Sequence, residues 1–148
     1  MSRGWLALAL IAALFSGPAS SLPAQTADAS GSAQRCYDYR YGGDGLLTDY
    51  RQSLKHCRQA AEQGSANAQT LLAELYFLGL GSAQDLAGAL HWYTQAALQG
   101  HAHAQLMLHE MYRLGLGTVR NPQAARYWLH KAAVNGHPQA LAFTATAP

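Results

Sequence analysis

The chain has 148 residues, a length typical of a single domain. Its 10 Lys and Arg side chains and 8 Asp and Glu side chains give a formal net charge of +2. A nucleic-acid-binding surface needs a basic stripe that displaces counterions from phosphates, and the sequence holds no cluster of Lys and Arg; we therefore expect no nucleic-acid partner.

The first 24 residues have the organisation of a secretory signal peptide. Arg3 precedes the apolar run Trp5–Phe15, and small residues follow in "SGPASSLPAQ". The run of 11 apolar residues is short for a stable membrane anchor, which needs about 20 residues. A membrane anchor or a buried helix is the alternative interpretation. We expect export to the periplasm or out of the cell, cleavage between Ala19 and Gln25, and no stable membrane insertion afterwards.

The segment after the expected cleavage site is rich in small residues. Removing residues 1–24 takes away one base, Arg3, and leaves 9 bases against 8 acids. The stretch "QTADASGSAQ" at 25–34 is rich in Ala, Ser, Gly and Thr and predicts a flexible leader.

The rest of the chain, residues 35–148, repeats itself. The stretch "AQTLLAELYFLGLG" at 68–81 returns as "AQLMLHEMYRLGLG" at 104–117, with 9 of 14 positions identical and an offset of 36 residues. Periods of this size indicate stacked supersecondary units that bury each other's apolar faces. Written in register, the chain contains two full units at about 60–95 and 96–131, a degenerate unit at about 35–59 and a truncated cap at 132–148. We expect Leu141 and Phe143 of this cap to cover the last helix pair; docking of the incomplete end onto another chain is the alternative.

Each unit predicts two helices joined by a turn. In the first helix, apolar and small residues at the spacing of one helix face end at Gly79, which suits a helix stop in the left-handed region. Asp85 and Asn121 are good N-cap residues for the second helix, and Pro122 suits its first turn. Gly64, Gly100 and Gly136 are expected to follow the ends of second helices. We therefore predict an all-α solenoid of stacked antiparallel helix pairs.

The repeated positions resemble the Sel1-like repeat family, a relative of the tetratricopeptide repeat. The family pattern occurs here as Ala68-Gln69, Leu72, Tyr76, Gly79, Gly81, Asp85, Ala89, Trp92-Tyr93, Ala96-Ala97 and Gly100. The second copy departs from the pattern at Asn121, at Leu129 and at His109, which stands where the family favours a small residue. The resemblance implies an exported bacterial α/α solenoid that binds other proteins, as an adaptor or as a regulator or immunity-type protein for an envelope enzyme or toxin.

The two cysteines are predicted to form a disulfide. Cys36 and Cys57 align with Leu72 and Tyr93 one unit later, which are inward positions on facing helices. A secreted chain favours their oxidation. Closing a loop of this size contributes roughly 3 kcal/mol by restricting the unfolded chain. A redox-active pair is the alternative, but the sequence has no Cys-x-x-Cys spacing.

A partner surface is predicted on the first helices, which line the concave side of such a stack. Subtracting the packing positions leaves one face expected to be exposed, on which an acid of each unit runs beside an aromatic residue or arginine. Its positions are Gln34, Tyr37, Asp38 and Tyr41 in the first unit, Thr70, Ala73, Glu74 and Phe77 in the second, and Leu106, His109, Glu110 and Arg113 in the third. The candidate binding residues are Tyr41, Glu74, Phe77, His109, Glu110 and Arg113. Aromatic residues and arginine are common interface anchors; a solvated helix face is the alternative for the acids.

Catalytic and metal-binding patterns are weak. His101, His103 and His109 lie close in sequence, but their spacing does not match a structural zinc site. No Ser-x-x-Lys, Gly-x-Ser-x-Gly or phosphate-binding loop is present. We therefore expect no enzyme activity, no cofactor and no metal. The first hypothesis is a periplasmic or secreted scaffold that binds a protein or peptide in the concave groove; the alternatives are an inhibitor or immunity-type protein and, more weakly, a hydrolase or metal-binding protein. The oligomeric state stays open.

Overall fold

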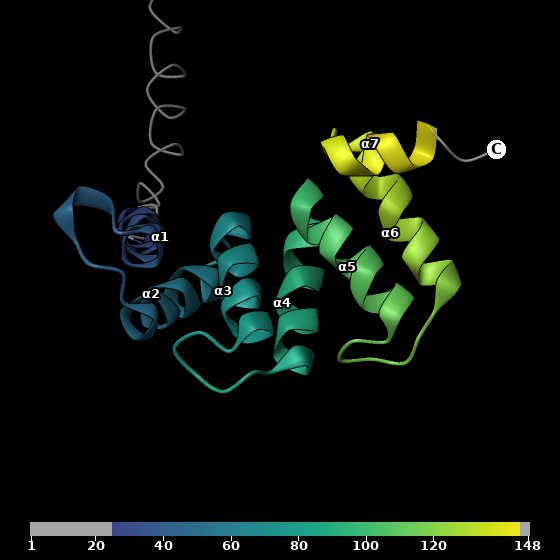
Figure 1. Ribbon diagram of the computed structural model, residues 1–148. Coiled ribbons are helices and arrows are strands. Elements are labelled where there is room, and N and C mark those ends of the chain that lie inside the picture. The colour runs from purple at the N-terminus through teal and green to yellow at the C-terminus, as the bar shows by residue number, and fades with distance from the viewer. Residues whose placement is uncertain (1–24, 146–148) are drawn as a thin grey trace, which may run out of the picture.

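The computed structural model describes residues 25–145, which are helical and contain no strand. The predicted signal peptide at 1–24 lies outside the described residues. The helices follow one another as stacked antiparallel pairs, and the last lies across the end of α6 (Figure 1). They are α1 (Gln25–Tyr41), the 3-10 turn η1 (Gly43–Gly45), α2 (Tyr50–Glu62), α3 (Ala66–Leu78), α4 (Leu86–Leu98), α5 (Ala102–Leu114), α6 (Pro122–Val134) and α7 (Pro138–Ala145).

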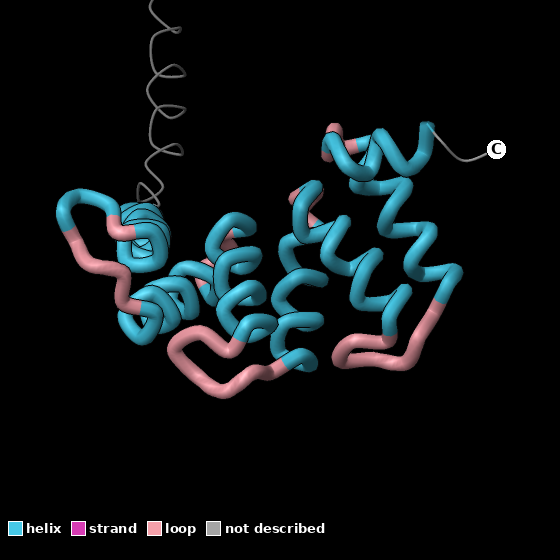
Figure 2. Tube along the Cα trace, in the orientation of Figure 1, coloured by secondary structure: helices cyan, strands magenta, loops and turns pink. Residues whose placement is uncertain are grey.

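The loops inside the units follow the predicted capping. Gly79 and Gly115 end α3 and α5 in the left-handed conformation, with φ of 67° and 74°. Asp85 then begins α4 by accepting the N–H of Gly88 at 2.8 Å, and Asn121 begins α6 in the same way. These loops lie along the lower edge in Figure 2, opposite the short turns that join one unit to the next. The helix boundaries expected from the repeat are thereby confirmed.

The turns between units also repeat. Gly64, Gly100 and Gly136 have positive φ, and the following N–H closes each turn on an alanine carbonyl of the helix before it. The residue that closes the second turn, His101, donates to the carbonyl of Ala96 at 3.1 Å. This closure reverses the chain within a few residues, so each first helix packs directly on the preceding second helix.

The Ala-Gln pair of the repeat has a specific packing role. Gln69 is buried and donates through Nε2 to the carbonyl of Ala61, at 3.1 Å, in the preceding helix. Gln105 donates in the same way to Ala97, at 2.9 Å. Gln99 in turn donates to Oε1 of Gln69 at 2.7 Å. Buried side-chain amides must be satisfied, so this chain of hydrogen bonds fixes how successive units meet.

A disulfide lies within the apolar core of the first unit. Cys36 and Cys57 form the predicted disulfide, which joins α1 to α2 with their Cα atoms 4.7 Å apart. The hydroxyl of Ser53 donates to the carbonyl of Cys36 at 2.9 Å. The rings of Tyr39 and His56 stack at 5.5 Å, where the next unit has Leu75 and Trp92. The degenerate sequence at 35–59 thus still forms a complete helix pair.

Two expectations about the ends of the domain need correction. Within the described residues α1 covers Gln25–Tyr41, so the segment 25–34, predicted to be a flexible leader, is helical, with Ser32 buried. In α7 the buried contact comes from Ala140, which packs with Leu106 and Ala132. Leu141 and Phe143, expected to cover the last pair, remain 48% and 56% exposed.

Among the helices within residues 25–145, none is long and apolar enough to cross a membrane.

Candidate binding surface

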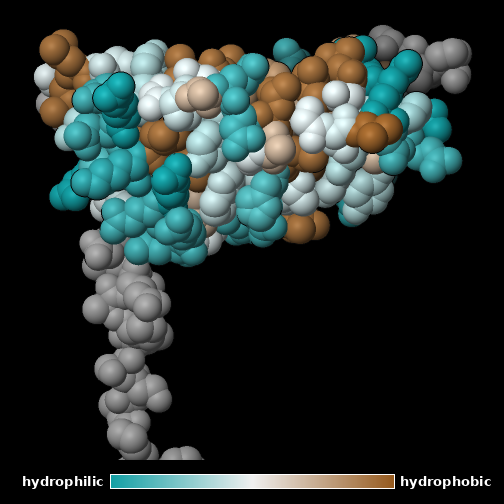
Figure 3. All heavy atoms as spheres, turned by 90° about the horizontal axis from the view of Figure 1, so that it is seen from below, coloured by the Kyte–Doolittle hydropathy of each residue, from teal (hydrophilic) through white to brown (hydrophobic). Residues whose placement is uncertain are grey.

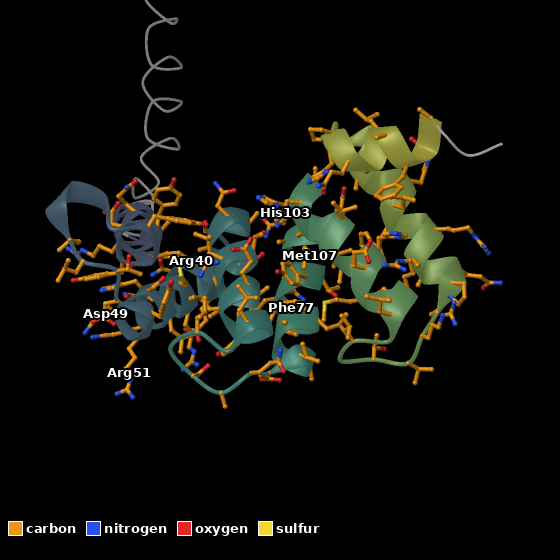
Figure 4. All side chains as sticks on the ribbon, viewed as in Figure 1. Arg40, Asp49, Arg51, Phe77, His103 and Met107 are labelled. Atoms are coloured by element: carbon orange, nitrogen blue, oxygen red, sulfur yellow. A yellow bond between two sulfur atoms is a disulfide. The ribbon has the colours of Figure 1, made fainter. Side chains whose placement is uncertain are left out.

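The first helices of successive units are joined on one face by a shared carboxylate. Arg40 of α1 donates to Oε2 of Glu74 at 3.0 Å, and Nε2 of His103 on α5 lies 3.2 Å from Oε1 of the same residue. Glu74 on α3 therefore links three helices that are far apart in sequence. We call this surface the first-helix face and define it by Arg40, Glu74, His103, Met107 and Glu110; the first, third and fourth of these are labelled in Figure 4.

The electrostatics of Glu74 reflect these contacts. Burial of the side chain raises the pKa of Glu74, but the hydrogen bond from His103 and the charge of Arg40 outweigh burial and hold the pKa below its ordinary value. Arg40 itself is only 10% exposed, so its charge depends on Glu74 for compensation. With its pKa lowered, Glu74 is ionised at neutral pH and held in place by Arg40 and His103. Nearby, burial raises the pKa of Tyr93 far above its ordinary range.

The structure exposes some of the predicted binding residues and partly buries others. Tyr41 is exposed beside Tyr37, with ring centroids 4.6 Å apart, at the α1 end. Arg113 is exposed and pairs with Glu110, which is 31% exposed. Phe77 is partly buried and packs on the core cluster between α3, α4 and α5. Of this predicted set, the residues open to solvent are thus Tyr41 and Arg113, with Glu110 partly accessible.

His109 does not project into a groove, and its predicted exposure is wrong. The residue is 9% exposed, and its Nδ1 lies 2.9 Å from the carbonyl of Ala125. A carbonyl can only accept, so Nδ1 donates and ties α5 to α6. The other expected exposed positions, Asp38, Thr70, Ala73 and Leu106, are also buried. Thr70, Ala73 and Leu106 turn towards the second helix or the next unit rather than towards solvent. Asp38 instead lies against Gly43 in the turn that follows its own helix.

Sequence reasoning placed Glu110 on this face but did not predict the pocket that it lines. A pocket of about 550 Å³ opens between α5 and α7, with Met107 and Phe143 among its walls. The remaining lining residues are His103, Leu106, Glu110, Gln139 and Ala142. Met107 and Phe143 are 36 residues apart, and Leu71 precedes Met107 by the same interval. The return of a large apolar residue at this position was the signal that could have revealed the pocket.

The histidines near the turn have structural partners. Nδ1 of His101 lies 3.4 Å from the N–H of Ala104 and 3.2 Å from the hydroxyl of Thr70. Its Nε2 lies 3.1 Å from Oδ1 of Asn67. His103 stacks on His137 at 5.8 Å. Within residues 25–145 no group of three His, Cys, Asp or Glu side chains is arranged to hold a metal ion.

The opposite edge of the molecule offers a different kind of surface. A shallower hollow of about 730 Å³ lies beside the η1–α2 loop. Asp49 and Arg51, which are labelled in Figure 4, are among its lining residues. Leu47 and Val119, at equivalent loop positions, are 89% and 84% exposed. Seen from below, however, apolar residues are scattered among hydrophilic ones (Figure 3). The pocket between α5 and α7 has the more continuous apolar lining.

The stacked pairs, their capped loops and their shared surface define an α/α repeat solenoid. A family model described as the Sel1 repeat matches residues 33–65, 66–101 and 102–137. The chain belongs to the Sel1 repeat family. The model recognises the degenerate first unit as a repeat, and its boundaries at 66 and 102 coincide with the first residues of α3 and α5.

Solved structures agree with this assignment. The chain is similar to a Sel1 repeat protein from Oxalobacter formigenes, with 33% identity and a TM-score of 0.70, over 78% of this chain and 86% of that one. It is also similar to a protective antigen of uropathogenic Escherichia coli strains with an SLR fold, with 30% identity and a TM-score of 0.74, over 79% of this chain and 25% of that one. Helicobacter pylori cysteine rich protein B shares the fold at 19% identity and a TM-score of 0.66, over 86% of this chain and 99% of that one.

No curated protein matches the chain. Sel1 repeat proteins are generally scaffolds for protein interaction and are typically not enzymes. The resemblance inferred from the repeated residues is therefore confirmed at the level of family and fold.

Proposed function

We propose that this protein is an exported, non-catalytic scaffold that binds a protein or peptide partner in a concave groove formed by its first helices. The observation that carries the proposal is the continuity of the first-helix face. Glu74 joins Arg40 on one side and His103 on the other, so three units present one surface instead of three separate ones. A preorganised surface of this kind loses less conformational entropy when a partner binds.

The residues proposed to form or support the contact are Tyr41, Glu74, Phe77, Glu110 and Arg113. Tyr41 and Arg113 are exposed and belong to residue types that often anchor interfaces. Phe77 supports the surface from beneath, because it packs on the core. His109 acts indirectly, since its bond to Ala125 fixes α5 at the point from which Glu110 projects.

Export is supported by two independent features. The disulfide between Cys36 and Cys57 belongs to a type that persists in oxidising compartments. Arg3 and the apolar run Trp5–Phe15 have the pattern of a secretory signal. Together they favour the periplasm or the exterior of the cell as the place where the partner is met.

Crosslinking from defined positions tests this proposal. A photoactivatable residue at Arg113 lies on the proposed surface, and one at His91 lies on the exposed side of the second helix α4. We expect a specific crosslinked protein from the envelope fraction at Arg113 and none at His91. A partner captured only at His91, or no partner at either position, contradicts the proposal. If the captured partner is an enzyme that loses activity on binding, the inhibitor function replaces the adaptor function.

A further inference from the structure

The pocket between α5 and α7 has an apolar floor and a single charged wall. Leu106 and Met107 contribute from α5, and Ala142 and Phe143 contribute from α7. Its volume of about 550 Å³ exceeds that of one large side chain, so it can hold such a side chain together with part of the attached main chain. The chemistry of the floor selects an apolar group.

The charge of the pocket comes from Glu110. Among the described residues that line the pocket, Glu110 is the one carboxylate, and no Lys or Arg is among them. Glu110 pairs through Oε2 with Arg113, whose side chain is half exposed, and its Oε1 lies 3.6 Å from Nε2 of His109. Pairs with so exposed a partner contribute little to stability. A second cation can therefore approach this carboxylate at small cost, which makes the rim complementary to a basic group beside the apolar one.

A polar row runs parallel to the apolar positions. Asn67, His103 and Gln139 occupy equivalent sites in three successive units, one helical turn before Leu71, Met107 and Phe143. Oδ1 of Asn67 is engaged by His101, which leaves the amide NH2 available to donate. Gln139 is exposed on the pocket rim. Side-chain amides both donate and accept, so they match the unpaired N–H and C=O groups of an extended peptide.

We propose that the pocket receives a large apolar side chain of an extended peptide segment in the partner, with a lysine or arginine next to it that pairs with Glu110. This inference rests on the proposed scaffold function and specifies the chemistry of its partner. The polar row binds the peptide main chain, the floor formed by Met107 and Phe143 takes the apolar side chain, and Glu110 sets the preference for a basic neighbour.

The methionines allow a direct measurement. In the purified protein labelled with ¹³C at the methionine methyl groups, Met107 reports on the pocket, while Met111, which is fully buried in the core, serves as an internal control. The probes are three blocked hexapeptides in a Gly/Ser background that carry Phe-Lys, Ser-Lys or Phe-Glu at the centre. We expect the Phe-Lys peptide to shift the Met107 signal and leave Met111 in place.

The three peptides separate the two parts of the proposal. The Ser-Lys peptide should bind at least about tenfold more weakly, since removing a phenylalanine from an apolar pocket costs more than a factor of ten in affinity. The Phe-Glu peptide should bind several-fold more weakly than Phe-Lys at low salt, because its carboxylate meets Glu110. Equal binding of Ser-Lys overturns the apolar anchor, and equal or tighter binding of Phe-Glu overturns the basic neighbour.

Matched variants locate the interaction. Phe143→Ser should abolish the Met107 shift, whereas Leu141→Ser should preserve it, because Leu141 lies on the same helix with similar exposure but does not line the pocket. Glu110→Gln should bring Phe-Lys and Phe-Glu to the same affinity. If Leu141→Ser and Phe143→Ser weaken peptide binding alike, the pocket is not the binding site and the proposal is wrong. If both variants instead change how the molecular mass depends on protein concentration, this face is a contact between copies of the chain, and the proposal is again wrong.

The crosslinking and peptide experiments together separate failure of the pocket proposal from failure of the scaffold proposal. If crosslinking at Arg113 captures a partner but no peptide shifts Met107, the scaffold proposal stands and the pocket assignment is wrong. If the Phe-Lys peptide binds as expected while no partner is captured from the envelope, the pocket chemistry stands and the scaffold proposal is wrong.

Discussion

Gly81 lies directly against the main-chain carbonyl of Tyr50, so a loop of the second unit touches the start of a helix in the first. The same relationship recurs between Gly117 and Leu86 one unit later. A Cβ atom at either glycine would overlap the backbone of the neighbouring unit, and both glycines also have positive φ. The second glycine of the Gly-x-Gly pattern is thus a contact between units, whereas the first ends a helix.

This contact predicts a difference between two glycine substitutions. Gly81→Ala should destabilise the protein by on the order of 3 kcal/mol or more, since it combines left-handed strain with a clash against backbone. Gly64→Ala is the matched control, because Gly64 also has positive φ but faces open space; it should cost about 1 kcal/mol. Urea unfolding measures both values. Equal losses would show that the contact between units does not matter.

The disulfide should carry much of the stability of the first unit. Replacing Cys36 and Cys57 together by serine should lower the free energy of unfolding by about 3 kcal/mol, because the unfolded chain regains the freedom of the loop. Hydrogen exchange should accelerate in α1 and α2 more than in α5 and α6. A uniform acceleration across all helices would instead mean that the solenoid unfolds as one cooperative unit.

The shared carboxylate should be a strong link between units. Glu74→Gln should destabilise the protein by roughly 1–3 kcal/mol, because it leaves the buried Arg40 without a compensating charge. Glu62→Gln, on the exposed end of α2, is the control and should change stability by less than about 0.5 kcal/mol. Since the pKa of Glu74 is lowered, its contribution is present at neutral pH and is lost only as the pH falls through that lowered value. A thermal-unfolding midpoint that is the same in both variants contradicts the link.

Mild acid should destabilise the fold through His101. Burial, followed by the charge of His103, lowers the pKa of His101, so the unfolded chain binds the proton more readily. Stability should therefore fall as the pH drops below about 6.5, where an ordinary histidine becomes protonated. Protonation also removes the acceptor at Nδ1 that caps the N–H of Ala104.

A substitution already present in the repeat tests this pH dependence. Ser65 occupies the equivalent position and accepts the N–H of Ala68 at 3.3 Å. His101→Ser should keep the cap and reduce the fall in stability below about pH 6.5. Because burial lowers the pKa of His137 and His56 as well, a smaller slope should persist. An unchanged slope in His101→Ser would falsify the assignment.

The helix pairs could be predicted because their causes are local. Asp85 and Asn121 cap helices through neighbouring N–H groups, and Gly79 ends a helix through its own backbone freedom. Because these capping residues recur every 36 residues, the order in which the helix pairs stack could also be predicted. The disulfide between Cys36 and Cys57 could be predicted as well, since the repeat placed both on facing helices.

The exposed face was predicted less accurately than the helix pairs. His109 and Thr70 were expected to face solvent, but each turns towards a helix that lies later in the chain. The first-helix face depends on contacts such as Arg40 with Glu74, whose partners are 34 residues apart. Subtracting core positions within one helix cannot reveal which remaining positions a neighbouring unit covers.

The sequence by itself determined the class of fold, the phase of the helices and the covalent link, because capping, helix periodicity and cysteine placement act over short distances or repeat at a fixed interval. The tertiary structure alone decided where the surface opens. The small rotation between units brings Met107 and Phe143 to the walls of one pocket and buries His109 against Ala125. That rotation is the sum of many packing contacts between units, and no single stretch of the chain encodes it.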